Sequence, residues 1–138
     1  MPLYLCNSPK STISDEAKPA IAADITRIHC EVTGAPPAFV HVFFLEDSPF
    51  LPLEGKSVVL LGNIRAGRTD ETKAGMIEQM VQSLHKNAGI PIEDIQGTAI
   101  DTPARWIMEG GDVFPEPGEE AAWLAAHEAK LSVSGSNI

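Results

Sequence analysis

The sequence predicts an α/β (α+β) fold in which two tandem βαβ units form a mixed four-stranded sheet with helices on one face. The first observation behind this prediction is an internal repeat. Shifted by 55 residues, the chain aligns with itself without a gap from residue 14 to 36. Residues 14–18 then correspond to 69–73, and 34–36 correspond to 89–91. The other residues match only in their apolar positions, so the repeat reflects a shared architecture.

The second observation is that helical and extended patterns alternate within both units. Apolar side chains recur at helical spacing from Ile21 to Val32, and stretches rich in β-branched and aromatic residues lie around them. Pro19 would lie within the first helix, at some cost to its stability. The predicted elements are a strand at 3–6, a helix between Ser14 and Gly34, strands at 39–45 and 57–64, a helix between Thr69 and Gly89, and a weaker strand at 95–100 interrupted by Gly97.

These elements predict a single domain over residues 1–130. A βαβ unit pairs its two strands in parallel and places its helix on one face of the sheet. No further helix is available for the opposite face, so we expect an oligomer that covers it. The predicted parts are repeats at 2–46 and 57–102, a C-terminal segment at 103–130 with a short helix at 119–130, and a flexible tail at 131–138.

Composition excludes several classes of function. Ten basic and 19 acidic residues give a net charge of -9, which disfavours binding to nucleic acids. The apolar stretch at 39–45 is far shorter than the ~18 residues that span a bilayer, and the N-terminus does not resemble a signal peptide. We therefore expect a cytoplasmic protein without a membrane partner. Two cysteines, four scattered histidines and no glycine-rich phosphate loop predict neither a metal site nor a cofactor.

Two arginines form the local basic cluster that an anionic ligand would need. Arg65 and Arg68 follow a predicted strand and precede a helix N-cap, a place where helix N-termini already favour anions. Two guanidinium groups three residues apart could clamp one carboxylate from two directions. The alternative is an exposed pair that offsets Asp70 and Glu71.

Pro2 is a second candidate for chemistry. Removal of Met1, which a small second residue permits, would leave Pro2 with a secondary amine whose reference pKa is about 8. Apolar surroundings or a nearby cation would lower the pKa of this amine and make it a general base or acid near neutrality. The alternative is a proline that merely precedes the first strand.

Further candidates come from single positions. His29 lies at the edge of the apolar stripe near the end of the first helix, where a buried structural histidine is the simpler interpretation. Glu109 lies in an apolar patch before a glycine turn, which would raise a carboxyl pKa, although an ordinary loop glutamate fits as well. His41 is predicted to pack within its strand, and Trp106 and Phe114 to line the core or a pocket.

Several of these features occur in a recognisable order on the double repeat. They are Pro2, His29 before a Gly-Pro break, the Arg65-x-Gly-Arg68 element before a threonine cap, and Glu109 upstream of a Pro-Glu-Pro-Gly-Glu stretch and Trp123. Together, over about residues 2–125, they resemble the cis-3-chloroacrylic acid dehalogenase group of the tautomerase superfamily. The resemblance implies a barrel-like homotrimer that acts on a small carboxylate substrate without a cofactor.

The resemblance also implies a role for each matching residue. Pro2 would be the catalytic amine, which in tautomerisation shuttles a proton between an enol oxygen and carbon. Arg65 and Arg68 would hold the substrate carboxylate with the assistance of His29. Glu109 would position or activate water in a dehalogenase reaction.

One position departs from the family pattern. Thr98, which the alignment places among the substrate-binding residues, stands where the dehalogenases have a tyrosine that helps the glutamate handle water. Threonine is shorter and its hydroxyl differs in acidity. We therefore expect a proline-dependent tautomerase of small unsaturated 2-oxo or 2-hydroxy carboxylic acids with weak cis-3-haloacrylate dehalogenase activity. Two alternatives stay open: a hydratase, dehalogenase or decarboxylase of a three-carbon unsaturated acid, and a non-catalytic carboxylate-binding scaffold.

Overall fold

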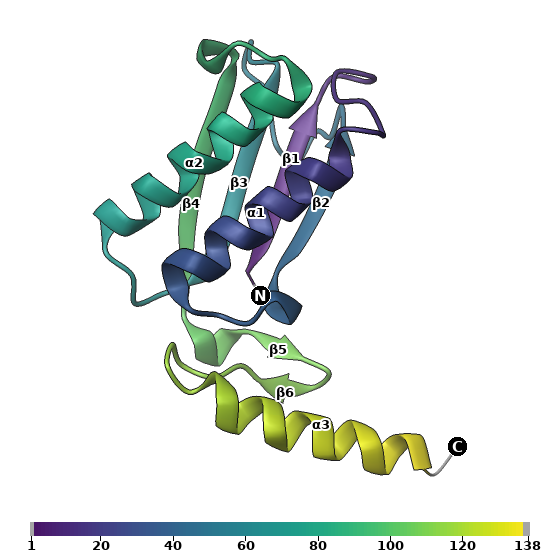
Figure 1. Cartoon of the computed structure of the whole chain (residues 1–138), viewed down its shortest axis with the longest axis vertical. Coiled ribbons are helices and arrows are strands. Elements are labelled where there is room, and N and C mark those ends of the chain that lie inside the picture. The colour runs from purple at the N-terminus through teal and green to yellow at the C-terminus, as the bar shows by residue number, and fades with distance from the viewer. Residues whose placement is uncertain (1, 137–138) are drawn as a thin grey trace.

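The computed structural model describes residues 2–136, in which two helices pack on one face of a four-stranded sheet and a small hairpin and a third helix lie beyond one end of it (Figure 1). The elements are β1 (Leu3–Ser8), α1 (Lys18–Thr33), η1 (Pro37–Phe39), β2 (His41–Glu46), β3 (Val58–Arg65), α2 (Asp70–Ala88), η2 (Ile92–Asp94), β4 (Ile95–Thr102), η3 (Ala104–Trp106), β5 (Met108–Glu109), β6 (Asp112–Val113) and α3 (Glu120–Ser136). None of the helices in this described part of the chain has the length and hydropathy that crossing a bilayer requires.

The sheet confirms the predicted pair of βαβ units. Its strand order is β2-β1-β3-β4, with β1 parallel to β2 and β3 parallel to β4. The two units meet through the antiparallel pair β1–β3, in which Leu3 lies opposite Asn63. This topology brings the starts of β1 and β2 and the ends of β3 and β4 to the same edge of the sheet.

The first helix begins later than the sequence predicted. The Ser14 hydroxyl accepts a hydrogen bond from the backbone N–H of Ala17 at 3.1 Å and closes a turn there, so that α1 begins only at Lys18. Pro19 therefore lies in the first turn, where a backbone N–H has no partner within the helix. The expected cost of Pro19 does not arise.

Two other elements are longer than expected. β4 continues through Gly97 to Thr102, because the missing side chain lets the strand approach α2. A Cβ on Gly97 would lie only 2.5 Å from Cγ2 of Ile77 and 3.0 Å from Cγ2 of Val81. α3 runs to Ser136, so most of the predicted tail at 131–138 is helical, and residues 137–138 lie outside the described residues.

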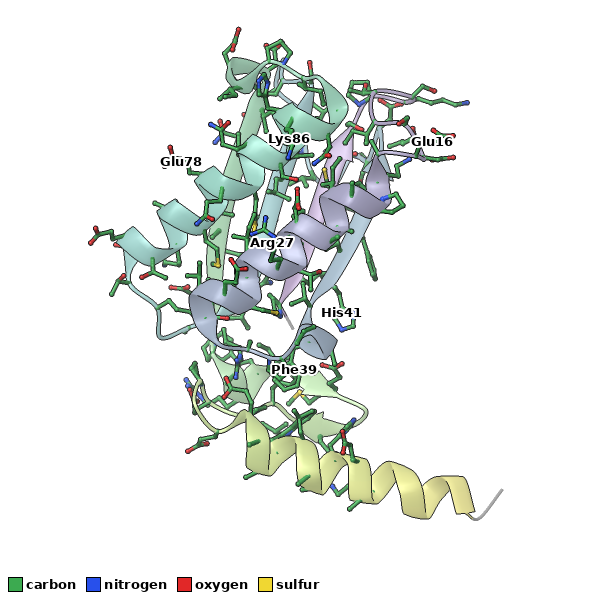
Figure 2. All side chains as sticks on the ribbon, viewed as in Figure 1. Glu16, Arg27, Phe39, His41, Glu78 and Lys86 are labelled. Carbon is green, nitrogen blue, oxygen red and sulfur yellow. The ribbon has the colours of Figure 1, made fainter. Side chains whose placement is uncertain are left out.

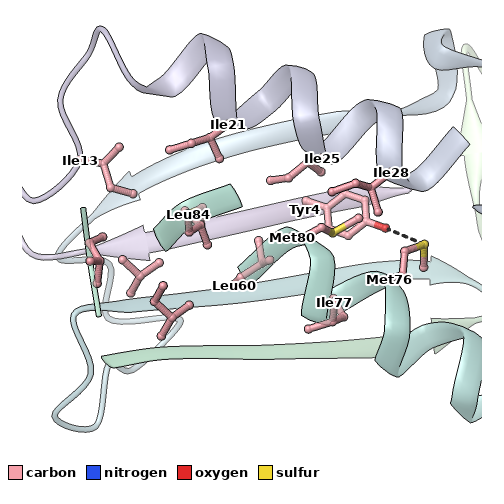
Figure 3. Packing of buried hydrophobic residues seen from close by; sticks show 14 of the residues in the cluster. Tyr4, Ile13, Ile21, Ile25, Ile28, Leu60, Met76, Ile77, Met80 and Leu84 are labelled. Atoms are coloured by element: carbon pink, nitrogen blue, oxygen red, sulfur yellow. Dashed lines mark hydrogen bonds between the residues drawn. The ribbon is translucent and has the colours of Figure 1, made fainter. Parts of the chain in front are cut away.

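The main core fills the space between the sheet and the two helices (Figure 3). Tyr4 and Cys6 of β1 and alternate residues of β3 point toward the helices and are fully buried. The helices contribute their apolar stripes, which are Ile21, Ile25 and Ile28 from α1 and Met76, Ile77, Met80 and Leu84 from α2.

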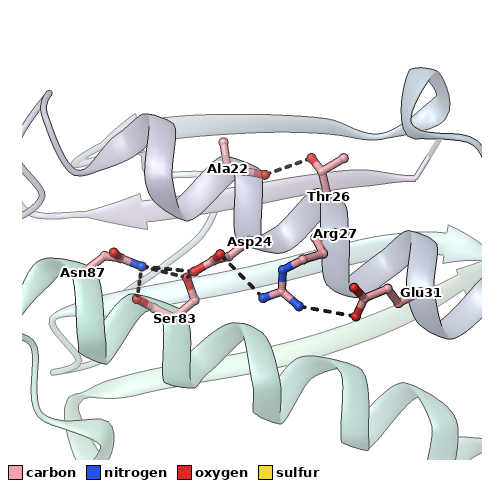
Figure 4. A network of polar contacts seen from close by, with 7 residues as sticks. All are labelled: Ala22, Asp24, Thr26, Arg27, Glu31, Ser83 and Asn87. Atoms are coloured by element: carbon pink, nitrogen blue, oxygen red, sulfur yellow. Dashed lines mark hydrogen bonds and ion pairs between the residues drawn. The ribbon is translucent and has the colours of Figure 1, made fainter.

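Polar contacts hold the outer sides of α1 and α2 together (Figure 4). Asp24 accepts hydrogen bonds from the Ser83 hydroxyl at 2.8 Å and from the Asn87 side chain at 3.2 Å. Arg27 lies 3.5 Å from Asp24 and 3.3 Å from Glu31. The two helices are therefore joined by apolar contacts and, at Asp24, by polar ones.

A second, smaller core joins the C-terminal segment to the edge of the sheet. Phe39 of η1 packs against Phe114, with ring centroids 4.5 Å apart, and against Trp123 of α3. The sequence predicted that Phe114 and Trp106 line the core or a pocket. Phe114 is a core residue, whereas Trp106 is 67% exposed.

The opposite face of the sheet is open in the single chain. Because strand side chains alternate between the faces, Leu3, Phe43 and Ile100 point away from the helices. Phe43 is 55% exposed and Ile100 is 43% exposed. The adjoining hairpin adds Met108, which is 59% exposed, so this face presents apolar surface to its surroundings.

The close approach at Gly97 leads to a first prediction. Gly97→Ala should lower the free energy of unfolding by about 1–3 kcal/mol, because the added methyl group overlaps two branched side chains. The matched control is Gly75→Ala in α2, where a Cβ meets nothing within 4 Å. This control should be neutral or raise stability by up to about 1 kcal/mol through helix propensity. Urea unfolding followed by circular dichroism measures both; equal effects would contradict the role of Gly97.

Candidate active site

Pro2 lies at the sheet edge where the ends of the four strands meet. It is buried, and its carbonyl oxygen accepts a hydrogen bond of 3.0 Å from the backbone N–H of His41. Since Pro2 precedes Leu3, which lies opposite Asn63, it sits beside the carboxyl end of β3. The neighbouring functional groups fall into two sets, one on the helix-covered side of the sheet and one on the open side.

Tyr4 and His29 form the buried part of the first set. The Tyr4 hydroxyl and His29 Nδ1 are 2.7 Å apart, and the two rings meet edge to face. Burial lowers the pKa of His29 to about 3, assisted by the charges of Arg68 and Arg65. Burial also raises the pKa of Tyr4, outweighing the opposite effect of Arg68. Both side chains are therefore neutral near pH 7, and with Tyr4 donating to Nδ1 the imidazole carries its proton on Nε2.

Arg68 supplies the positive charge of this set. Its guanidinium is half-buried and donates a hydrogen bond of 3.2 Å to the backbone carbonyl oxygen of Arg65. Burial and the charge of Arg65 lower the Arg68 pKa, yet an arginine stays protonated at neutral pH. Among residues 2–130 no carboxylate lies within ion-pair distance of this guanidinium. A partly desolvated cation without a carboxylate partner is suited to holding an anion.

Arg65 does not take part in the predicted two-arginine clamp within this chain. Its side chain is 1% exposed, and it donates hydrogen bonds to the Pro115 carbonyl oxygen at 2.8 Å and to Glu120 at 2.9 Å. Its guanidinium carbon also lies 5.6 Å and 5.3 Å from the ring centroids of Phe39 and Phe114. The structure thus uses Arg65 to hold the C-terminal segment, since a buried guanidinium needs a carboxylate partner.

Glu120 is the ion-pair partner of Arg65, and the sequence analysis did not identify it. Burial by itself would raise the pKa of its carboxyl group. The hydrogen bond from Arg65, backbone N–H groups including that of Gly118, and the charge of Arg65 outweigh this effect and leave the pKa below its ordinary value. Glu120 is therefore ionised at neutral pH and neutralises Arg65, which leaves the half-buried Arg68 as the cation available to a ligand.

The second set lies on the open side of the same edge. Glu109 in β5 is half-buried, and its Oε1 lies 3.5 Å from Nε2 of His41. His41 does not pack within its strand as the sequence predicted, since its side chain is 45% exposed and faces the hairpin (Figure 2). These two side chains share a hollow with four apolar residues, which are Leu3, Phe43, Ile107 and Met108.

Thr98 is the one predicted site residue that this chain does not bring to the edge. It lies in the middle of β4 opposite Leu61, about 13 Å along the strand from Thr102. It is exposed and contributes to a separate hollow with residues of α2. The site residues that sequence reasoning missed are Tyr4, His41 and Glu120; only Tyr4, two residues after Pro2 on a strand, had a detectable signal.

Known proteins resemble this chain in sequence and in fold. A family model described as "Putative oxalocrotonate tautomerase enzyme" matches residues 1–58. "Probable tautomerase bsl7456" of Bradyrhizobium diazoefficiens is 42% identical over 50 residues, which are 36% of this chain and 75% of that protein. The crystal structure of N1, a member of the cis-3-chloroacrylic acid dehalogenase family, has a TM-score of 0.82 at 29% identity and covers 99% of this chain and 100% of its own.

A more distant structure shows the same fold. It is a fused 4-OT described as an asymmetric trimer, with a TM-score of 0.68 at 23% identity over 81% of this chain and 95% of its own. The shared fold and the curated relative define the class: the chain belongs to the tautomerase superfamily. Within that superfamily it falls in the cis-3-chloroacrylic acid dehalogenase-like group, as the order of Pro2, His29, Arg68 and Glu109 predicted.

The buried state of His29 predicts a pH-dependent stability. The folded protein keeps His29 neutral to about pH 3, whereas an unfolded chain protonates it near pH 6.5. The contribution of neutral His29 to the free energy of unfolding is therefore complete above pH 6.5. It is lost as the pH falls, at up to about 1.4 kcal/mol per pH unit. Between pH 6.5 and 5, the free energy of unfolding in urea should fall more steeply for the wild type than for His29→Gln. Parallel slopes would contradict a buried neutral His29.

The Arg65–Glu120 ion pair predicts a second stability effect. Glu120→Gln should lower the free energy of unfolding by about 3 kcal/mol at pH 7, because the buried Arg65 charge loses its counter-charge. The adjacent Glu119→Gln changes an exposed residue and should cost less than about 0.5 kcal/mol. Because the native pKa of Glu120 is lowered, its contribution is present above about pH 4.3 and disappears as the pH falls below it. If Glu120→Gln lowers the free energy of unfolding at pH 3 by as much as at pH 7, that result would argue against the ion pair.

Proposed function

We propose that this protein is a cofactor-independent tautomerase in which Pro2 moves a proton on a small unsaturated 2-oxo or 2-hydroxy carboxylic acid. One observation carries the proposal: the half-buried cation of Arg68, without a carboxylate partner among residues 2–130, lies beside neutral His29 and Tyr4 at the edge where β1 begins. An anion held there lies next to the first residues of the chain. Membership of the tautomerase superfamily agrees with this chemistry.

The amine of Pro2 is the proton carrier in this proposal. Removal of Met1 leaves a secondary amine with a reference pKa of about 8. The buried position of Pro2 and the charge of Arg68 both disfavour an ammonium ion, so an appreciable fraction of the amine is neutral at pH 7. The neutral amine takes the proton of the enol hydroxyl, and the resulting ammonium returns it to carbon, so the product differs from the substrate only in the position of one hydrogen and the double bond.

Arg68 and His29 hold the substrate in register with that amine. The Arg68 guanidinium binds the carboxylate through charge-assisted hydrogen bonds. Nε2 of His29 donates a further hydrogen bond, and because His29 is neutral it contributes direction rather than charge. Arg65 acts indirectly, since its backbone carbonyl receives the Arg68 hydrogen bond while its side chain is held by Glu120.

A homotrimer completes the proposal. The open sheet face presents Phe43 and Ile100, and a monomer seldom leaves such a face uncovered. A fused 4-OT with this fold is described as a trimer. Thr98 lies on that face of the edge strand β4, so in such an assembly it would face a neighbouring subunit. The mass in solution by light scattering tests this assembly, and a monomeric mass would contradict it.

Turnover of phenylenolpyruvate to its keto form tests the proposed activity, after intact mass has confirmed that Met1 is removed. Pro2→Ala should lower kcat at least about 100-fold, because a positioned general base contributes that much or more. Arg68→Ala should raise KM about 10-fold or more, because a hydrogen-bonded charge pair is lost.

The matched control for Arg68 is Arg105→Ala. Arg105 is exposed and its guanidinium lies over the Trp106 ring, so its replacement should leave kcat and KM within about 2-fold. Full activity in Pro2→Ala would refute proline-based catalysis. Binding of the ligand without any turnover in the wild type would instead favour a non-catalytic carboxylate-binding scaffold.

A further inference from the structure

Tyr4 is a buried polar side chain that the proposed proton transfer leaves without a role. Its ring is fully buried between the sheet and the helices, and its hydroxyl lies 2.7 Å from Nδ1 of His29. We infer that Tyr4 is a positioning residue, which fixes the tautomer and the direction of His29 so that Nε2–H of the imidazole meets the substrate carboxylate. The inference rests on the proposed function, because that function places a carboxylate beside His29 and Arg68.

The sheet holds the ring of Tyr4 in place. Tyr4 of β1 lies opposite Gly62 of β3, and a Cβ on Gly62 would come within 2.6 Å of Cε1 of the tyrosine ring. The ring therefore fills the space that a side chain at this position of β3 would need. The imidazole of His29 meets the ring edge to face, at an interplanar angle of 73°. Because close packing confines the ring, its hydroxyl oxygen keeps a fixed position next to Nδ1.

Two arrangements of protons would satisfy this pair. In the first, Tyr4 donates to Nδ1 of His29 and the imidazole proton is on Nε2. In the second, Nδ1–H donates to the Tyr4 oxygen, and the hydroxyl turns toward Sδ of Met76, which lies 4.0 Å away (Figure 3). A thioether sulfur is a weak acceptor, whereas the imidazole nitrogen at 2.7 Å accepts at a normal hydrogen-bond distance. The first arrangement is therefore the more stable one.

A bound carboxylate favours the same arrangement. With the proton on Nε2, His29 donates a hydrogen bond to a carboxylate that Arg68 holds. In the second arrangement Nε2 would present a lone pair to that carboxylate, and two acceptors facing each other form no hydrogen bond. An imidazolium is excluded as well, because burial and the charges of Arg68 and Arg65 lower the pKa of His29 to about 3. His29 is thus a neutral donor, and proton transfer is left to Pro2.

Tyr4→Phe tests this role, because it removes the hydroxyl and keeps the ring. Nδ1 of His29 then has no donor from Tyr4, so both tautomers become populated and the hydrogen bond from Nε2 to the substrate is weakened. KM for phenylenolpyruvate should rise about 3- to 10-fold, the size of one lost neutral hydrogen bond. The value of kcat should stay within about 3-fold, because Tyr4 acts on substrate binding and not on the proton carrier.

Nitrogen NMR of isotope-labelled histidine side chains detects the tautomer directly and needs no turnover. Among the four histidines of the chain, the signals of His29 are those that His29→Gln removes. In the wild type, Nε2 of His29 should have the shift of a protonated nitrogen and Nδ1 that of an unprotonated one. In Tyr4→Phe the two shifts should move toward each other, because the tautomers exchange. A wild-type His29 with its proton on Nδ1 overturns the inference.

Ser83→Ala is the matched control. It also removes a buried hydroxyl that bonds to α1, through a hydrogen bond of 2.8 Å to Asp24, but near the other end of α2 from Arg68. Ser83→Ala should leave KM within about 2-fold and the tautomer of His29 unchanged. If it changes both as much as Tyr4→Phe does, the effect of Tyr4 is a general loss of packing and the inference is overturned.

A double-mutant cycle separates action through His29 from a direct effect of Tyr4. In a His29→Leu background, Tyr4→Phe should change KM less than about 2-fold, because the group that it positions is already absent. An undiminished rise of KM in that background overturns the inference, and so does an unchanged tautomer and KM in Tyr4→Phe alone. Urea unfolding identifies any variant that fails to fold, and the NMR comparison of wild type with Tyr4→Phe then decides. A wild type without turnover would refute the proposed function, while the tautomer is still measured.

Discussion

The buried ion pair between Arg65 and Glu120 is the contact on which the rest of the site depends. It joins the end of the sheet to the start of the last helix, two parts of the chain that share no strand pairing. The aromatic rings of Phe39 and Phe114 close around the guanidinium and exclude water from it. Because the pair is satisfied internally, the neighbouring Arg68 keeps an unneutralised charge. The same attachment brings the hairpin with Glu109 against the start of β2. One ion pair thus determines both the charge and the outer wall of the site.

The alternation of side chains along β1 divides the site into two environments. On the helix side, burial keeps His29 and Tyr4 neutral, so that they direct hydrogen bonds without changing the charge. On the open side, Glu109 and His41 remain half-exposed and available to water. Pro2, directly before the start of β1, borders both environments. The amine in the proposed reaction therefore has neutral, buried neighbours on one side and neighbours that water can reach on the other.

Most of the fold could be predicted from the sequence, because the repeat and the apolar periodicity are local patterns. The same patterns place Pro2, His29 and Arg68 near the ends of their elements, and the antiparallel pairing of β1 with β3 brings these ends to one edge. The ion pair could not be predicted, because Arg65 and Glu120 are 55 residues apart and neither position has a periodic signal. The sequence predicts that Pro19 lowers the stability of the first helix, because the pattern does not show the turn closed by Ser14. That turn moves the start of α1 to Lys18 and so places Pro19 in the first turn. Thr98 was expected among the substrate-binding residues from the resemblance alone, and no local pattern shows that it lies in the middle of β4.

The antiparallel join between the two repeats has a consequence for the number of reactive centres. The position equivalent to Pro2 in the second repeat is Ser57, at the opposite edge of the sheet, where its backbone N–H is hydrogen-bonded to the Asp94 carbonyl oxygen at 2.8 Å. That nitrogen lies inside the polypeptide and is an amide, which has no basic lone pair. Of the two equivalent strand starts, only that of the first repeat can therefore carry a chain terminus. In the proposed mechanism, therefore, only the first repeat supplies a basic amine.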